Sequence, residues 1–364
     1  MNSKLDQISI LTSADESRWN EIYDQLPARL QDIHFTFDYN FLYEKNGDGE
    51  IRLFVFQRNE QIYFYPFLLR EIVLNGSKTD YKDIETVYGY TGPISSTDDL
   101  GFLKEADLAF SDYCKSENVI TEFIRFNPLL QNQKIAEWNP SVKLIALRDY
   151  VVIDLKMSEG ELFSSYDSTN RNKIRKSQKS GVQFELDHTC NSFSNFKNIY
   201  LENMKRINTS KMYFFSKEFF DGLKQLAIKS GVLINAKLNE EIIGATVFFK
   251  SKDYSHYFLS SANEVGRRNA VSNLMLHHGA IWAKEQGAEQ MHIGGGVTAE
   301  LNDPLLSFKK SFSKKTVKFY IGKRIHNASA YEEIVAAWDK ENPEYSMKYK
   351  SILQRYRFTK EELS

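Results

Sequence analysis

One order of elements occurs twice along this chain of 364 residues: two helices, a strand hairpin, a helix and a further strand. The hairpin of the first part comprises residues 51–57 and 61–69, and that of the second comprises residues 232–238 and 242–250. The two parts show no repeated sequence, so only their topology is repeated. We therefore expect two α/β (α+β) units, each with helices flanking a mixed, mostly antiparallel sheet.

Other segments with helical or extended periodicity complete this order. Helices are expected at residues 19–30, 35–43, 103–116, 193–206, 216–230 and 270–286, and strands at 119–126, 142–153, 254–260 and 290–293. Two further helices, ending at residue 341 and spanning 345 to about 357, are separated by Pro343. The expected domains are residues 1–155 and 156–330, followed by a helical tail at 331–364.

Composition excludes several classes of protein. Hydrophobic residues make up 42% and charged residues 26%, as in ordinary globular proteins, and the net charge of −1 does not suit a general nucleic-acid coat. Cys114 and Cys190 have no paired spacing, so neither a disulfide framework nor a zinc knuckle is expected. The N-terminus has no apolar signal segment, and no apolar run is long enough to span a bilayer. These features predict a cytoplasmic protein with no DNA partner and leave peripheral contact with the inner membrane face open.

A glycine loop followed by a short helix is the most informative local motif. The strand at 290–293 runs into three consecutive glycines, Gly294, Gly295 and Gly296. Asp303 is a good helix N-cap, and Pro304 suits the first helical position. Phe308 and Phe312 are four residues apart and can share a buried face, which turns Lys309 to another side. Such a loop and lysine can hold a negatively charged reacting group, although a plain turn with a solvated lysine is the alternative.

A strongly basic helix is expected at residues 171–181. Arg171, Arg175 and Lys179 fall on one stripe, flanked by Lys173 and Lys176, with no acid among them. Neighbouring like charges cost roughly 0.2–0.5 kcal/mol per pair. An anion such as phosphate or RNA would offset this cost, and a solvated helix face is the alternative.

Four segments together resemble a known family. They are residues 88–93, with the sequence Tyr-Gly-Tyr-Thr-Gly-Pro; the basic segment 170–182; residues 244–249, Gly-Ala-Thr-Val-Phe-Phe; and the late glycines followed by Phe308-Lys309. Over roughly residues 10–330 the chain resembles the Fem-type peptidoglycan aminoacyltransferases and their FemAB-like GNAT acyltransferase relatives. The resemblance implies two tandem GNAT-like domains.

It also implies roles for individual residues. Lys309, beside Phe308, would stabilise charge on the acyl group during transfer. Arg171 or Arg175 would bind the diphosphate of a nucleotide- or lipid-linked acceptor, and the loop that holds Tyr90 and Gly92 would contribute to substrate binding. Relatives that act on murein precursors carry an early lysine, but residues 35–39 read Phe-Thr-Phe-Asp-Tyr here, and a murein acceptor is therefore not implied.

Acyl transfer to an amine requires a stabilised oxyanion and a path for a proton. Backbone at Gly294, Gly295 and Gly296 would approach the donor, and Tyr254 or Tyr257 could relay the proton. Arg267 and Arg268, before the helix at 270–286, could meet phosphates of acyl-CoA or of a transfer-RNA 3′ end, and the donor stays open between these two. His256 is expected to be a core or surface residue. His277 and His278 lack a third partner, so neither a metal nor a permanently bound cofactor is expected.

The sequence thus predicts an N-acyltransferase or aminoacyltransferase. Its acceptor would be an amino group on a cell-envelope or surface-polysaccharide precursor, such as a nucleotide- or lipid-linked amino sugar or a peptide. The alternative is a non-catalytic module of the same fold that binds a phosphorylated ligand or RNA.

Overall fold

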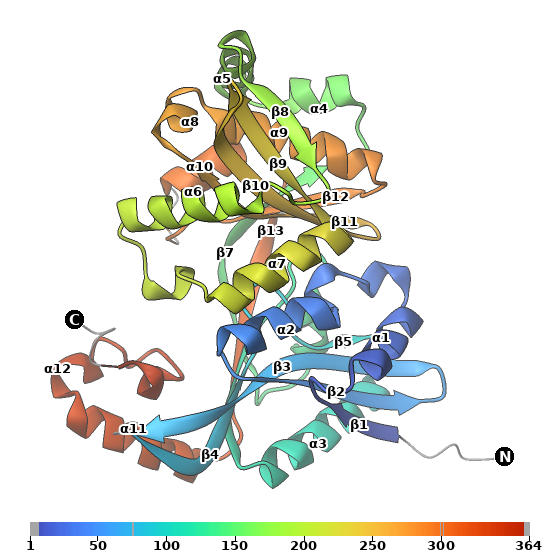
Figure 1. Cartoon of the computed structure of the whole chain (residues 1–364). Helices are drawn as coiled ribbons and strands as arrows, with labels where there is room; N and C mark the ends of the chain where they lie inside the picture. The colour runs from blue at the N-terminus through green and yellow to red at the C-terminus, as the bar shows by residue number, and fades with distance from the viewer. Residues whose placement is uncertain (1–6, 75, 299, 301, 360–364) are drawn as a thin grey trace. The chain divides into compact units, whose positions relative to one another are not determined.

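The computed structural model describes residues 7–74, 76–298, 300 and 302–359. The chain forms two compact units, each containing a sheet and its own helices (Figure 1). The first unit comprises Met1–Leu30, His34–Leu147 and Phe319–Ser364, and the second comprises Gln31–Ile33 and Arg148–Lys318. The chain therefore passes between the units at 30/31, 33/34, 147/148 and 318/319. From the sequence, divisions are expected at 155/156 and 330/331.

The first unit has a sheet with the strand order β1-β2-β3-β4-β6-β13, and β5 pairs with β3. Its strands are β1 (Gln7–Leu11), β2 (Glu50–Arg58), β3 (Gln61–Leu74), β4 (Ser77–Glu85), β5 (Ile94–Ser95), β6 (Val119–Arg125) and β13 (Thr316–Ile325). Its helices are α1 (Glu16–Gln25), α2 (Phe37–Asn46), α3 (Leu100–Ser116), α11 (Ala328–Glu341) and α12 (Pro343–Ser346), with 3-10 turns η1 (Ala28–Leu30), η3 (Asn132–Ala136) and η5 (Arg355–Arg357). Among the described ladders of the first unit, β4–β6 is parallel and the others are antiparallel.

The second unit repeats this order as β8-β9-β10-β11-β12-β7. Its strands are β7 (Lys143–Asp154), β8 (Gln183–Asp187), β9 (Gly231–Leu238), β10 (Glu241–Ser251), β11 (Tyr254–Ala262) and β12 (Gln290–Gly294). Its helices are α4 (Glu159–Ser165), α5 (Ser168–Lys179), α6 (Phe193–Arg206), α7 (Lys217–Ser230), α8 (Glu264–Arg268), α9 (Val271–Glu285) and α10 (Pro304–Lys310), with the 3-10 turn η4 (Lys211–Tyr213). β7 and β13 carry residues of both units, as does η2 (Ile33–Phe35). The expected α/β architecture, with mostly antiparallel sheets flanked by helices, is confirmed.

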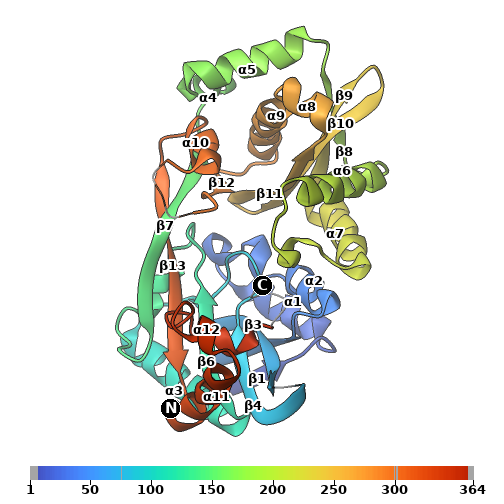
Figure 2. The same ribbon diagram turned by 90° about the vertical axis from the view of Figure 1, so that its left-hand side faces the viewer.

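The second sheet is covered on both faces. Figures 1 and 2 show α6 and α7 over one face and α9 over the other. This explains β10, in which residues 243–249 are all buried and read as a continuous apolar run instead of an alternating pattern. The core on the α9 side joins Phe248 to Leu274 and extends to Leu306 and Phe312 of the late segment.

The C-terminal segment belongs to the first unit. α11 packs Ile334 and Trp338 against Ile72 and Ile120 of the sheet. The expected second helix from 345 to about 357 is wrong, because only α12 and the short turn η5 form there. Side chains around η5 reach strand β4 instead: Gln354 Nε2 donates to the carbonyl oxygen of Ile84 (3.0 Å), and the hydroxyl of Tyr356 donates to Asp83 (2.9 Å).

Candidate active site

Strands β11 and β12 diverge in the second unit. Their parallel register contains three pairs and ends at His256 opposite His292. β11 then continues along β10 to Ala262, while β12 continues along β7 to Gly294 with an irregularity after His292. After His256 and His292 the two neighbouring strands therefore pair with different partners.

The glycine loop that follows β12 needs glycine for close packing. Gly294 has φ +81°, in the left-handed region. A β-carbon on Gly295 would stand 2.3 Å from the ring of Tyr150, and one on Gly296 would stand 2.5 Å from the carboxyl carbon of Asp303. The three glycines are therefore fixed by internal contacts, and their predicted part in donor binding stays a prediction.

Asp303 joins this loop to helix α10. One carboxylate oxygen accepts from the backbone N–H of Leu306 (2.8 Å), which caps the helix as the sequence predicts. The other accepts from the N–H groups of Val297 (3.0 Å) and Thr298 (2.9 Å). These backbone hydrogen bonds, chiefly those from Thr298 and Leu306, lower the pKa of Asp303 to about 2. The carboxylate stays charged at neutral pH and holds the loop against α10.

Lys309 is buried against the same loop. Its ammonium Nζ donates to the carbonyl oxygen of Gly295 at 2.8 Å, and the side chain is 9% exposed. Phe308 and Phe312 pack edge to face on the other side of α10, 5.4 Å apart, so the helix turns the lysine toward the glycines. Burial lowers the pKa of Lys309 from 10.5 to about 8, and the negative charge of Asp303 offsets only part of this shift. A cation is thus held, at the cost of desolvation, where the backbone loop leaves β12.

The two tyrosines of β11 differ in environment. Tyr254 is buried at the start of the strand. Tyr257 is half-buried against Phe248 (5.6 Å) and belongs to the same core as Phe308. Burial raises the pKa of Tyr257 to about 12. Its phenol is therefore neutral at physiological pH and suits donation of a proton.

The two arginines before α9 make local contacts. Arg267 donates to the carbonyl oxygen of Ala262 (2.7 Å), and Arg268 forms an exposed ion pair with Glu264. Ala270 follows in the left-handed region (φ +54°) and turns the chain into α9. Both guanidinium groups lie near the helix start, as expected, but the contacts seen here are internal.

The basic helix α5 begins at Ser168, three residues earlier than expected. Arg171 donates to the carbonyl oxygens of Ser164 (2.9 Å) and Tyr166, so it satisfies the end of α4. The guanidinium of Arg175 lies 5.2 Å from the ring centre of Phe163. Three exposed lysines complete the cationic face of α5: Lys173, Lys176 and Lys179. These lysines and Arg175 make no ion pair within the described part of the chain, so they can receive an anion more readily than Arg171.

Tyr90 and Gly92 belong to the first unit, unlike the site residues above. Gly92 has φ +75° and packs closely on Phe126, and the ring of Tyr90 contacts Phe319 at 5.6 Å. Asn132 Nδ2 donates to the carbonyl oxygens of Thr91 (2.7 Å) and Pro93 (2.9 Å), which fixes the loop. The loop is ordered, and its expected part in substrate binding stays a prediction.

Several contacts of the site come from residues that the sequence did not single out. Arg148 donates to the carbonyl oxygens of Gly296 (2.9 Å) and Val297 (2.8 Å). His256, expected as core or surface, is a buried partner of Asp32, with 2.6 Å between Nε2 and the carboxylate. The two residues of that pair are 224 positions apart, so local patterns carry no signal for it.

His277 and His278 are residues of α9, the first buried and the second half-buried. The hydroxyl of Tyr166 is 3.3 Å from Nδ1 of His277, and His278 stacks on Phe184. Burial lowers the pKa of both imidazoles to about 4. They are neutral at physiological pH, as expected for packing residues.

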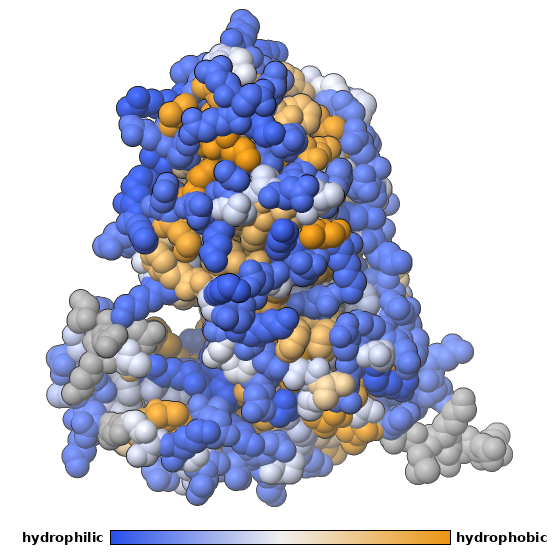
Figure 3. Space-filling model, in the orientation of Figure 1, coloured by the Kyte–Doolittle hydropathy of each residue, from blue (hydrophilic) through white to orange (hydrophobic). Residues whose placement is uncertain are grey.

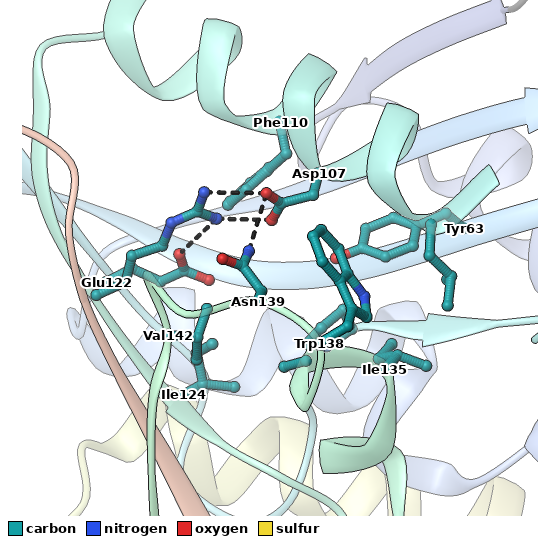
Figure 4. A pocket seen from close by; sticks show the side chains of 13 residues that line it. Tyr63, Asp107, Phe110, Glu122, Ile124, Ile135, Trp138, Asn139 and Val142 are labelled. Carbon is teal, nitrogen blue, oxygen red and sulfur yellow. Dashed lines mark hydrogen bonds and ion pairs between the residues drawn. The ribbon is translucent and has the colours of Figure 1, made fainter. Parts of the chain in front are cut away.

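A small pocket in the first unit is lined by charged side chains that bind one another (Figure 4). Its volume of about 20 Å³ holds roughly one water molecule. Asp107 accepts two hydrogen bonds from Arg324 (2.7 and 3.0 Å) and one from Asn139 Nδ2 (3.0 Å). The pocket is therefore part of a buried polar network and offers no space for a substrate.

Comparison with known proteins agrees with this geometry. Residues 164–303 match the family described as the acetyltransferase (GNAT) domain. The crystal structure of FemX is similar over 90% of this chain and 99% of that one, with 15% identity and a TM-score of 0.65. The C-terminal domain of a putative lysylphosphatidylglycerol synthetase from Agrobacterium fabrum matches 92% of this chain and 96% of its own, with 13% identity and a TM-score of 0.55. A tandem GNAT protein from the clavulanic acid biosynthesis pathway matches 89% and 99%, with 9% identity and a TM-score of 0.50.

No curated protein matches the sequence. At these identities the solved structures show the fold, and the domain match covers the segment that contains α5, β11 and the glycine loop. The chain therefore has a fold similar to those of FemX and of a tandem GNAT protein, and residues 164–303 of its second unit match the acetyltransferase (GNAT) domain family. The predictions of a FemAB-like tandem GNAT fold and of an acyltransferase domain are confirmed.

Within the described residues, no helix is both long enough and apolar enough to span a membrane.

Proposed function

We propose that the protein transfers an acyl or aminoacyl group to an amino group on a cell-envelope or surface-polysaccharide precursor, such as a nucleotide- or lipid-linked amino sugar. The observation that carries the proposal is the buried ammonium of Lys309 at the carbonyl oxygen of Gly295. This carbonyl oxygen lies on the loop after β12, the strand that diverges from β11. A fold gains no stability from a desolvated lysine that forms no ion pair with a described residue, so a catalytic role would account for its place.

Lys309 would stabilise the oxyanion of the transfer reaction. One N–H of its ammonium is donated to Gly295, and two remain for the oxygen of the donor carbonyl. The acceptor amine attacks the carbonyl carbon, a C–N bond forms, and negative charge gathers on this oxygen. The intermediate then collapses, and the C–S bond of a thioester or the C–O bond of an aminoacyl ester breaks. One hydrogen-bond donor to the oxyanion, in a site that excludes water, raises kcat by about 10²–10³.

Tyr257 would complete the proton balance. The leaving thiolate or alkoxide needs a proton, and the attacking amine loses one. The phenol of Tyr257, whose pKa burial raises to about 12, is protonated and would donate its proton to the leaving group. The resulting phenolate would take up the proton that the attacking nitrogen loses, which restores the phenol. Tyr254, which is buried at the other end of the ladder, is the second candidate for this role.

The choice of donor rests on the turn before α9. Acyl-CoA is the donor that a GNAT domain suggests, and the N-terminus of α9 would receive its pyrophosphate. Arg268 is exposed beside it and can leave Glu264 for a phosphate. An aminoacyl transfer RNA would present its 3′ end to the same place. The backbone at Gly294, Gly295 and Gly296 would border either donor.

The acceptor is inferred from charge and from similarity of fold. The cationic face of α5, with Lys173, Arg175 and Lys176, suits the diphosphate of a nucleotide- or lipid-linked sugar. One protein of similar fold is a putative lysylphosphatidylglycerol synthetase, whose name indicates an aminoacylated lipid. The loop of Tyr90 and Gly92 would add contacts to the acceptor.

Product detection tests the proposal. Purified protein is mixed with UDP-linked amino sugars and with either acetyl-CoA or charged transfer RNA, and the products are analysed by mass spectrometry. We expect the mass of one acyl group on the acceptor with one of the two donors. Consumption of neither donor by folded protein across nucleotide- and lipid-linked amino sugars would contradict transfer.

The alternative is a module that binds a phosphorylated ligand without turnover, which the unpaired cations of α5 also favour. Lys173→Glu with Lys176→Glu separates the two functions, because these side chains are exposed and Arg171 is not a neutral choice. A binding module loses ligand affinity and never consumes donor. The proposed transferase loses apparent acceptor affinity, seen as a higher KM, and retains turnover at saturation.

A further inference from the structure

We propose that residues 205–215, which comprise the last two residues of α6 and most of its connector to α7 and are called the connector below, dock on an anionic membrane surface. The segment reads Lys-Arg-Ile-Asn-Thr-Ser-Lys-Met-Tyr-Phe-Phe and contains three cations and no acid. Cations next to large apolar side chains are the pattern of segments that lie at a lipid interface. The proposal concerns where the protein works and needs no step of the proposed transfer reaction.

Three large apolar side chains of the connector face solvent. Ile207 is 47% exposed, Met212 is 53% exposed and Phe214 is 39% exposed. They fall within eight residues, and Figure 3 shows apolar surface over the connector between α6 and α7. Single exposed apolar residues are ordinary on protein surfaces, but three within eight residues of one connector indicate a binding surface.

The base of the connector is fixed by aromatic packing. Phe215 stacks on Phe219 with ring centres 4.0 Å apart, and the hydroxyl of Tyr200 donates to the carbonyl oxygen of Tyr213 at 3.0 Å. This packing uses the inner side chains of the segment and leaves Met212 and Phe214 outside. The exposed tips are thus held in place before any partner arrives, which reduces the entropy lost on docking.

The charges beside these tips select the partner. Lys205 and Arg206 end α6 with exposed side chains, and Arg206 donates to the side-chain oxygen of Asn203 (2.9 Å). Neither forms an ion pair with a residue that the structure describes. Phospholipid headgroups offer phosphates to these cations and acyl chains to the apolar tips, so an anionic bilayer satisfies both sets of side chains. An RNA partner would meet the cations but would leave Ile207 and Met212 exposed to water.

Vesicle co-sedimentation of the full chain tests the inference. The vesicles contain phosphatidylglycerol and phosphatidylcholine, with pure phosphatidylcholine as the neutral comparison. We expect binding to the anionic vesicles, and we expect Met212→Glu with Phe214→Glu to lower the vesicle affinity about ten-fold. The matched control is Leu108→Glu with Val73→Glu, which changes two exposed apolar residues of the first unit, 63% and 48% exposed.

The outcomes separate the inference from its rivals. Equal affinity of the connector variant and the control for anionic vesicles overturns it, as does failure of the parent protein to bind them. A parent protein that instead self-associates through these residues, shown by light scattering, also overturns it. Thermal melting confirms that both double variants are folded. Acyl transfer to a water-soluble amino sugar is measured in parallel, so loss of vesicle binding alone leaves the proposed reaction standing.

Discussion

The two units each contain a buried cation, and the surroundings of these cations differ. Arg324 of the first unit is 8% exposed and Lys309 of the second is 9% exposed. Arg324 forms two hydrogen bonds with Asp107 and lies 4.0 Å from Glu122. Burial opposes its charge, but the two carboxylates raise its pKa above the ordinary value. Lys309 instead contacts a carbonyl oxygen, and its pKa falls to about 8.

The parallel strand pairs of the two units differ in the same sense. In the first unit the β4–β6 ladder runs to Glu85 opposite Phe123, and the N–H of Thr86 continues it to the carbonyl of Phe123 (3.1 Å). Side chains of the C-terminal segment then bind Asp83 and Thr121 across these strands. In the second unit the matching ladder ends after three pairs. In the first unit, side chains of the C-terminal segment bridge the ladder. In the second, the ladder ends beside the loop that accepts a hydrogen bond from a buried cation.

The largest effect on stability is expected in the first unit. Arg324→Met leaves the buried Glu122 and the half-buried Asp107 without their shared cation, and this should lower the free energy of unfolding by about 3–5 kcal/mol. Chemical denaturation measures the change. Arg268→Met removes an exposed ion pair and should change stability by only about 0.5 kcal/mol. Similar small effects of both variants would show that the buried network does not hold the first unit together.

Lys309→Met should have the opposite sign. At pH 7 the depressed pKa corresponds to a penalty of about 3 kcal/mol for the charged state, and the lost hydrogen bond to Gly295 offsets about 1 kcal/mol of the gain. The variant should therefore be more stable by about 2 kcal/mol in denaturant unfolding. A loss of stability like that of Arg324→Met would mean that the ammonium has a structural role.

The pH dependence of this stability has a definite sign. The folded protein holds the Lys309 proton with a pKa of about 8, and the ordinary value of 10.5 applies to the unfolded chain. Between these values the unfolded state binds more protons, so the free energy of unfolding should rise with pH. Lys309→Met should lack this rise with pH, so the variant is the control for the parent protein.

The pH dependence of kcat should report the titration of Lys309 as well. If the protonated ammonium is required, kcat should fall above pH 8, by about ten-fold per pH unit. An ordinary lysine would keep its charge to about pH 10. A kcat that stays level up to pH 10 would separate Lys309 from the oxyanion.

Sequence patterns identify the elements whose signals are local. The hairpin turns contain Asn59 and Asn239 in the left-handed region, and β2–β3 and β9–β10 form where the apolar runs indicate. β4 is missed because its buried side chains include Asp83, which is neutralised by Arg70 and Arg357 and breaks the apolar period. The extended helix after residue 345 fails for a related reason, since Tyr356 and Arg357 are used by distant strands.

The candidate site divides in the same way. Asp303, Lys309 and the glycines lie within 16 residues of one another, so capping and helical spacing predict their contacts. Arg148 and Tyr150 of β7 contact that loop although they lie far from it in the sequence, so local patterns do not predict these contacts. A count of basic residues does not by itself identify the side chains that are available to a ligand. The guanidinium of Arg171 already donates to carbonyl oxygens at the end of α4.

The most direct measurement is kcat for Lys309→Met with the donor and acceptor pair found by mass spectrometry, beside Lys310→Met, its neighbour on the same helix. We predict a loss of about 10²–10³ for Lys309→Met in a protein that melts no lower than the parent. Lys310→Met should stay within about two-fold of the parent. Full turnover by Lys309→Met would contradict the assignment of the reaction to the buried ammonium of the second unit.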